Sequence, residues 1–265
     1  MITRLPRTIV DATSPDGAVV VRDWLDGLIT NSVHADAPIF AALLTPQGKI
    51  IADMVVTPIA GGFRLDTTEA MGAELLKRLK MYTLRAPITV EDASDSVAAY
   101  AVWDEAEDDL PAGAHPDPRH ASLGQRAFGA PSLAEVDLTA YDAHRLSLGV
   151  PDSLFDYGPS EVFPHDADMD ELNGIDLKKG CFVGQEVVSR MARLGTVRKR
   201  MRAVVLEAEA QEGDAIQSGT RRVGDILHVH GNMAMALVRL DRMEAATEAY
   251  TVGDAPVRIM EGPHG

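Results

Sequence analysis

The sequence has a single cysteine, Cys181, among its 265 residues. An intramolecular disulfide is therefore excluded, as is a zinc or iron–sulfur site built from several cysteines of this chain. No apolar run reaches the roughly 20 residues that a membrane-spanning helix needs, so we expect no membrane association. The first residues carry no apolar stretch behind their charges, which argues against a secretory signal. Together with the unpaired thiol, this predicts a cytoplasmic protein.

Positive charge is also scarce, since 25 lysines and arginines face 40 aspartates and glutamates, for a net charge of −15. A general nucleic-acid binder would carry the opposite sign. Residues 178–202 are the exception, because eight basic side chains there meet one acid, Glu186. We expect this basic segment to attract an anionic ligand or an acidic partner. A solvated helix face is the alternative interpretation.

With 46% hydrophobic residues the chain has the composition of a globular protein. Strand and helix signals alternate, which predicts an α+β fold. Residues 17–22 (GAVVVR) have the composition of a strand. Residues 39–44 and 50–56 are apolar runs joined by Thr-Pro-Gln-Gly, which predicts a hairpin covered on both faces.

A further strand over 63–67 precedes a helix that we expect to begin after Thr67 or Thr68 and to end near Leu84. We expect its buried face to consist of Met71, Leu75, Leu79 and Tyr82, which repeat at helical spacing. A second helix is predicted near 138–148, followed by an irregular segment over 159–183 and a helix from Gly184 to about Arg193.

After Gly195 the pattern changes to five or six short strands separated by glycine and aspartate, which predicts a small antiparallel barrel. We therefore divide the chain into residues 1–194 and residues 195–265, the second being a C-terminal β-barrel.

Two patterns resemble metal sites but lack residues that such sites require. The acidic residues of 166–170 begin like a calcium loop, but Glu171 stands where glycine is needed and Leu177 where a carboxylate is needed. An acidic surface turn is therefore expected. His228 and His230 lie two apart on a predicted strand and could reach one metal, but the sequence indicates no third ligand. We expect an exposed barrel strand there and predict no metal site.

The segment KKGCFVGQE over 178–186 carries the strongest local signal. Two glycines bracket Cys181 just before a helix, and both the lysines and the helix N-terminus favour the thiolate. A carboxylate at Glu186 could accept two N–H groups of a flat heterocycle. The alternative is a helix cap with a small buried cysteine. Pairing of the thiol with His144 or His165 as a base is a further alternative, which the spacing does not require.

KGCFVGQE strongly resembles the signature of the YgfZ family of folate-binding proteins. These are relatives of the glycine-cleavage T-protein, an aminomethyltransferase, and of a mitochondrial iron–sulfur assembly factor. The segments WLDGLITN (24–31) and LTPQGKIIAD (44–53) are similar to two further family segments. Residues 62–92, with their helix and Tyr82-Thr-Leu-Arg85, and the barrel opening at Gly195 also fit, so the resemblance covers nearly the whole chain.

The resemblance implies two small α+β domains and a C-terminal antiparallel β-barrel around a central opening that holds tetrahydrofolate. It implies a tetrahydrofolate-binding accessory role in assembly or repair of iron–sulfur clusters in client enzymes, including tRNA-modifying ones, with those clients or assembly proteins as partners. By position it assigns the folate side to Asn31, Gln47, Asp53, Tyr82 and Arg85, and the opposite wall to Lys179, Cys181, Gln185 and Glu186.

The sequence departs from the T-protein at two places. An Asp-Asp pair of the T-protein is Ala52-Asp53 here, and the T-protein segment whose glutamate grips the pterin has no counterpart, with residues 117–126 near that place. Glycine cleavage is therefore disfavoured, although a folate-dependent aminomethyl or one-carbon transferase stays the alternative, with Asp53 orienting folate and Cys181 as acceptor or nucleophile. Asp53 could instead be a structural strand residue.

A third interpretation is a binding module whose thiol forms a mixed disulfide with a client. We expect Cys181 to be a reactive or ligand-contacting thiol rather than a metal ligand, because one cysteine cannot hold a cluster alone. A cluster bridged to a second copy or a partner stays open.

Overall fold

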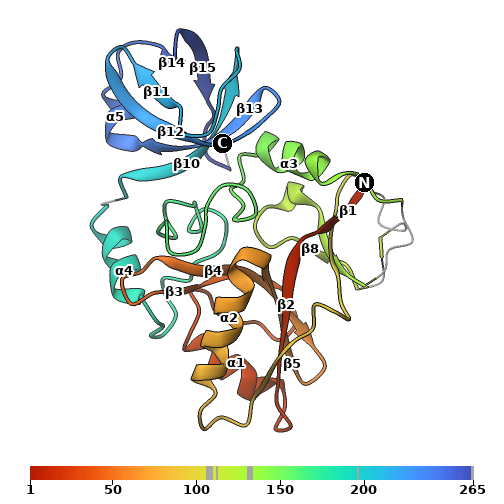
Figure 1. The fold of residues 1–265 in the computed structure, drawn as a ribbon. Coiled ribbons are helices and arrows are strands. Elements are labelled where there is room, and N and C mark those ends of the chain that lie inside the picture. The colour runs from red at the N-terminus through yellow and green to blue at the C-terminus, as the bar shows by residue number, and fades with distance from the viewer. Residues whose placement is uncertain (106–109, 112, 130–133, 196, 264–265) are drawn as a thin grey trace.

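The computed structural model describes residues 1–263 except 106–109, 112, 130–133 and 196. The described chain folds into two antiparallel sheets and a closed six-strand barrel, with helices beside the sheets. Figure 1 shows the barrel at one end, in blue, and the two sheets in the red-to-green body below it. The predicted α+β class with a C-terminal antiparallel barrel is confirmed.

The first sheet has the strand order β3-β4-β5-β2-β6. Its strands are β2 (Arg7–Thr13), β3 (Ile39–Leu44), β4 (Ile50–Ile59), β5 (Gly62–Thr68) and β6 (Thr89–Asp92). The predicted hairpin is confirmed as β3 and β4, which pair with Ala42 opposite Asp53. Every residue of β3 and the first eight of β4 are buried, as expected for a sheet covered on both faces.

Residues 17–22 do not form the predicted strand, because they begin helix α1 (Ala18–Asp26). Val21 and Leu25 are fully buried, whereas Val19 is 58% exposed. The apolar side chains thus follow the 3.6-residue period of one helix face, which the run of three valines conceals. Gly17 precedes the helix at φ 96°, a conformation that other residues rarely adopt.

Helix α2 (Glu69–Tyr82) begins after Thr68, as predicted, and buries Met71, Leu75 and Leu79 completely. The prediction was wrong for Tyr82, which lies in the last turn and is 36% exposed. Its backbone carbonyl accepts the indole N–H of Trp24 at 3.2 Å, so the end of α2 is tied to α1.

The second sheet has the order β1-β7-β9-β8. Its strands are β1 (Ile2–Leu5), β7 (Ala99–Val102), β8 (His115–Pro116) and β9 (Gln125–Phe128). A 3₁₀ turn (Ala121–Leu123) precedes β9, and helix α3 (Leu138–Ser147) follows it. The chain crosses from this sheet to the first at Pro6, between β1 and β2.

The barrel has the cyclic order β10-β13-β12-β11-β14-β15. Its elements are β10 (Lys199–Leu206), β11 (Ala215–Ser218), β12 (Arg221–His230), β13 (Met233–Arg239), α5 (Leu240–Glu244), β14 (Tyr250–Val252) and β15 (Ala255–Ile259). Val204, Ile216 and Val238 belong to its separate apolar core. The predicted domain boundary at 195 stays a prediction, although β10 begins four residues later.

Buried ion pairs fill the space between the two sheets. Arg119, which is 2% exposed, donates to both oxygens of Asp117 at 3.0 and 2.8 Å and to Asp152 at 2.8 Å. Burial alone would raise the pKa of Asp117 and Asp152, but Arg119, with Arg126 beside Asp117 and Arg7 beside Asp152, outweighs it and holds both pKa values well below 3.8. Both carboxyls are therefore ionised and paired.

A second ionic cluster joins the barrel to α3. His228 and His230 of β12 lie 2.7 and 3.3 Å from the same oxygen of Asp142, which also pairs with Arg145 at 2.6 Å. The expectation of an exposed barrel strand is therefore wrong at these histidines. Asp142, the third residue of this cluster, comes from α3 and lies 86 positions before His228. No local sequence pattern indicates this contact.

A third cluster holds β10 against the acidic turn at 166–170. Arg200 donates to Asp168 at 3.0 Å and to Asp170 at 2.9 and 2.8 Å, and Arg202 also pairs with Asp168. The expected acidic surface turn is thus partly buried, since Asp168 is fully inaccessible to solvent. The carboxylates of Asp168 and Asp170 are thus paired with guanidinium groups.

We predict that Arg119→Met lowers the free energy of unfolding by about 3–5 kcal/mol, because it leaves two buried carboxylates without their cation. Urea denaturation measures this directly. The control is Arg22→Met, since Arg22 pairs with Asp23 at the surface at 2.8 Å and should change stability by less than about 1 kcal/mol. A similar, small loss in both variants would contradict a structural role for the network.

Candidate functional site

The irregular segment at 159–183 is confirmed, and its backbone is fastened to the first sheet. Ile50 of β4 donates to the carbonyl of Val162 at 3.0 Å, and Ser160 donates to the carbonyl of Ile50 at 2.6 Å. Further along, Asp176 donates to the carbonyl of Thr30 at 3.0 Å. The segment is thereby held along the hairpin before it reaches the cysteine.

Lys179 fixes the cysteine loop from inside. Its ammonium donates to the carbonyls of Ile29 and Asn31 at 2.9 and 2.7 Å and lies 3.5 Å from a carboxylate oxygen of Asp26. The side chain is only 4% exposed, and this burial lowers the pKa of Lys179 against the opposing effect of Asp26. Lys179 therefore closes a structural contact between the loop and the segment after α1, while Lys178 points to solvent.

Two close contacts place helix α4 (Gln185–Arg193) against the hairpin turn. A Cβ at Gly184 would stand 2.8 Å from the carbonyl oxygen of Thr45, and one at Gly48 would stand 2.8 Å from Cβ of Val187. Both glycines also have positive φ, at 81° and 83°. Only glycine permits this approach, so the GQE and PQGK motifs are two sides of one packing contact.

Cys181 is exposed, so the alternative of a small buried cysteine is wrong. It opens on a cavity of about 310 Å³ whose other lining residues are Asp26, Gly27, Ser32, Lys179 and Gly180. Neither proposed base contacts the thiol among the described residues, because His144 stacks on Trp103 and His165 is 1% exposed. The site is therefore a lone, accessible thiol on a fixed loop.

Asp53 is enclosed rather than open to a ligand. It is 3% exposed, and its two carboxylate oxygens accept hydrogen bonds from the hydroxyls of Ser153 at 2.5 Å and Tyr157 at 2.9 Å. Burial raises the pKa of Asp53 above 3.8, with the nearby Arg7 acting in the opposite sense. As folded, the carboxylate of Asp53 is closed off from solvent, and its contact with folate stays a prediction.

The other candidates fall into two groups. Asn31 is used internally, since its amide donates to the carbonyls of Phe40 and Asn173 at 2.9 and 2.6 Å. The remainder reach the surface or lie near it, namely Gln47 in the hairpin turn, Tyr82 and Arg85 at the end of α2, and Gln185 and Glu186 in the first turn of α4. Because α4 packs on the hairpin turn, Gln47 and Gln185 lie on neighbouring elements, and their assignment to opposite walls of a folate site stays a prediction.

The basic segment is only partly free. Arg200 and Arg202 are held by the turn at 166–171, and Arg190 pairs with Glu186 at 2.6 Å. The exposed basic side chains outside this ion pair are Lys178, Arg193, Arg198 and Lys199. A groove of about 530 Å³ follows the outer side of α4 and includes Arg193 and Leu194, which is 66% exposed.

Sequence reasoning missed Asp26, Ser32, Ser153 and Tyr157. The first two lie within or beside the WLDGLITN motif, but nothing in its spacing indicates that they face the cysteine loop.

Over the described residues, no group of three or more histidine, cysteine, aspartate or glutamate side chains could hold a metal ion. In the same part of the chain, no helix has the length and apolarity to span a membrane.

We predict that Lys179→Met lowers the free energy of unfolding by about 1–3 kcal/mol, because it leaves two carbonyls and Asp26 without their donor. Lys178→Met is the matched control, since the adjacent lysine is exposed, and it should change stability by less than about 0.5 kcal/mol. Chemical denaturation of both variants measures the difference. Equal stability would mean that Lys179 does not fix the loop.

Comparison with known proteins identifies relatives along most of the chain. The family description "CAF17, C-terminal beta-barrel domain" matches residues 198–261. The human iron–sulfur cluster assembly factor IBA57, mitochondrial, is 26% identical over 296 residues, which cover 97% of this chain and 80% of the relative. A homologue of that factor from Neurospora crassa is 28% identical over 235 residues, 77% of this chain. The chain spans about half of the Neurospora protein, at 53% of its length.

The fold matches a known structure over its whole length. The crystal structure of the glycine cleavage system aminomethyltransferase T from Bartonella henselae superposes with a TM-score of 0.78, covering 100% of this chain and 86% of that chain at 12% identity. This likeness establishes the fold and confirms the T-protein-like architecture expected from the sequence. The barrel match and the matches to the IBA57 proteins show that the chain is similar to iron–sulfur cluster assembly factors of the IBA57/CAF17 type along most of its length.

Proposed function

We propose that this protein is an iron–sulfur cluster assembly factor that acts on client or carrier proteins through Cys181. The single observation that carries the proposal is the exposed thiol on a loop fixed by Lys179, within the segment that resembles the YgfZ signature. Thiolate is the preferred protein ligand of iron–sulfur clusters. The curated relatives that share this chain's sequence are named for cluster assembly.

One thiol needs a partner to complete a cluster site. The chain has one cysteine, and a cluster is normally held by four protein ligands, so the remaining ligands come from another protein or a small thiol. Here the cluster is cargo rather than a resident cofactor. The proposal thus refines the expectation of a ligand-contacting thiol by making the contact an intermolecular one.

The exposed basic side chains beside Cys181 favour an acidic partner surface. Lys178 precedes the thiol by three positions, and Arg193 lies at the end of α4. On a chain of net charge −15, such a patch would attract an acidic partner to the cysteine loop. The acidic remainder of the surface would repel the same partner. tRNA-modifying iron–sulfur enzymes are among the clients that the family resemblance implies.

We predict that deletion of the gene lowers the activities of iron–sulfur enzymes while glycine cleavage is retained. Complementation with the wild type should restore them, and Cys181→Ser, which keeps the side-chain size, should not. Ser189→Ala, on the neighbouring helix, is the control that should complement. Full rescue by Cys181→Ser would exclude a role for the sulfur, and a selective loss of glycine use as a one-carbon source would favour the transferase alternative.

We also propose that tetrahydrofolate binds beside Asp53 in a sparsely populated form of the protein, in which the surroundings of Asp53 are open. The likeness to an aminomethyltransferase fold over the full chain supports this ligand, and Asp53 offers a carboxylate whose pKa is raised by burial. Binding requires the hydroxyls of Ser153 and Tyr157 to leave Asp53. The observed affinity is then reduced by the small fraction of open molecules.

We predict that Tyr157→Phe tightens tetrahydrofolate binding in anaerobic calorimetry, because it removes one of the two hydrogen bonds that close off Asp53. The lost bond is worth about 0.5–1.5 kcal/mol, or roughly two- to tenfold in affinity. Asp53→Asn should abolish the effect. Absence of heat in both the wild type and Tyr157→Phe would overturn folate binding, whereas unchanged affinity in Asp53→Asn would move the ligand to another site.

A further inference from the structure

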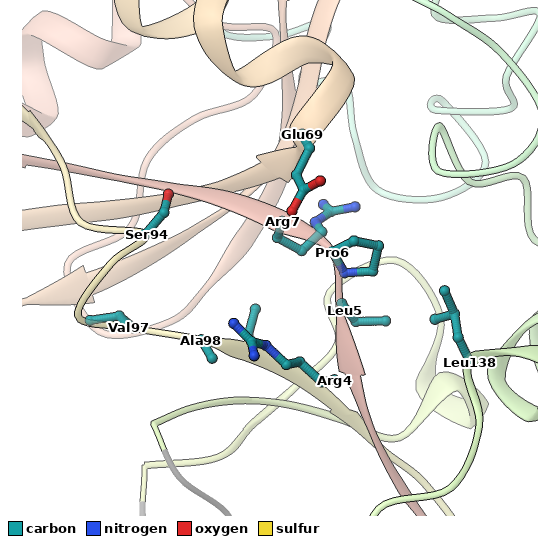
Figure 2. A pocket seen from close by; sticks show the side chains of 10 residues that line it. Arg4, Leu5, Pro6, Arg7, Glu69, Ser94, Val97, Ala98 and Leu138 are labelled. Carbon is teal, nitrogen blue, oxygen red and sulfur yellow. The ribbon is translucent and has the colours of Figure 1, made fainter.

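A separate cavity of about 310 Å³ lies where the chain crosses from β1 to β2, away from the cysteine loop in sequence (Figure 2). Its lining consists of residues 4–7, Glu69 at the start of α2, Ser94, residues 97–99 and Leu138 at the start of α3. Both sheets and two helices thus contribute to one concave surface. The cavity does not include Cys181, although Arg7 among its lining residues also lies near Asp53.

Arg7 gives the cavity a buried cation with unused donors. Its Nε donates to a carboxylate oxygen of Asp66 at 2.5 Å and its Nη2 to the carbonyl of Asp66 at 3.0 Å. Nη1 makes no hydrogen bond to the described residues, and its ion-pair partner Asp152 stands 3.8 Å away. The side chain is 4% exposed and lines the cavity, so a ligand group there can add a hydrogen bond to a donor that Asp152 meets only at 3.8 Å.

Two further charges line the same cavity, and they have opposite signs. Arg4 and Glu69 are both exposed, and neither makes a hydrogen bond or an ion pair with another described residue. Figure 2 shows the guanidinium of Arg4 and the carboxylate of Glu69 on different sides of the lining. A plain anion would be attracted to Arg4 and Arg7 but repelled by Glu69, whereas a zwitterion would use all three.

The rest of the wall is apolar. Leu5, residues 97–99 and Leu138 supply aliphatic side chains between the charged groups, as Figure 2 shows. Small-molecule sites typically combine such a wall with a few polar groups that fix orientation. An aliphatic chain of a few carbons would fit against it.

We propose that this cavity binds an α-amino acid with an apolar side chain. Its carboxylate would face Arg7 and Arg4, its ammonium group would face Glu69, and its side chain would lie on residues 97–99 and Leu138. Arg7 is already neutralised by Asp66, so the free charges of Arg4 and Glu69 sum to zero and match a ligand of zero net charge. This proposal is independent of the cluster-assembly function.

Three probes with one shared alkyl group test the proposal. L-leucine carries both charges, 4-methylpentanoate only the carboxylate, and 3-methylbutylamine only the ammonium group. Each is titrated into the full chain while the amide signals of the lining residues are followed by NMR. We expect leucine to bind most tightly, with each single-charge probe weaker by about two- to fivefold, as for the loss of an exposed ion pair.

Variants of the exposed charges separate the contributions. Arg4→Gln should weaken leucine and 4-methylpentanoate alike, and Glu69→Gln should weaken leucine but not 4-methylpentanoate. Arg258→Gln, an exposed arginine on the barrel strand β15, is the matched control and should leave all three probes unchanged. Ala98→Phe should fill the cavity and abolish binding, with its thermal unfolding midpoint as a check of the fold.

The proposal is overturned if no probe shifts the lining amides, or if leucine binds folded Ala98→Phe as it binds the wild type. Equal affinity of the wild type for leucine and 4-methylpentanoate would overturn it too, because Glu69 would then have no ligand role.

Discussion

Charge pairing inside the body, between guanidinium and carboxylate groups of the two sheets, is the interaction on which the rest of the structure depends. A buried charge is costly unless it is paired and hydrogen-bonded, so Arg119 holds the loops that carry Asp117 and Asp152 in one arrangement. The loop after Asp152 supplies the hydroxyls that bind Asp53 of β4. The segment that follows it lies along β4 and ends in the cysteine loop. The position of Cys181 is thus set by contacts that begin in the ionic interior.

The same chemistry orients the barrel. Arg200 and Arg202 bind the acidic turn at 166–171, and two histidines of β12 meet Asp142 of α3. These contacts pair Arg200 and Arg202, so their charges are not available to a partner. Lys178, Arg193, Arg198 and Lys199 stay exposed in the segment that contains Cys181 and α4. Burial separates two roles of the charged side chains. The buried, paired charges stabilise the fold, and the exposed charges are available to partners.

Local patterns predicted the hairpin of β3 and β4, the apolar stripe of α2 and the barrel, because each depends on neighbours in sequence. The three valines of 19–21 misled the strand prediction, because successive β-branched residues are typical of strands. In the structure they belong to α1, and only one side of that helix is buried. The interior pairs could not be predicted, because Asp53 and Ser153 lie 100 positions apart and Arg7 and Asp66 lie 59 apart. For the site, the motif identified Cys181, but Lys179 and Asn31 belong to the supporting contacts, which only the fold reveals.

The central claim is that Cys181 acts between molecules, as one ligand of a cluster shared with a partner. The most direct measurement is the iron and acid-labile sulfide content of the complex that co-purifies with the protein under anaerobic conditions, for the wild type and for Cys181→Ser. The account predicts a cluster in the wild-type complex, none in the isolated protein and none in the Cys181→Ser complex. A cluster of undiminished content in the Cys181→Ser complex, or one held by the isolated chain alone, would contradict it.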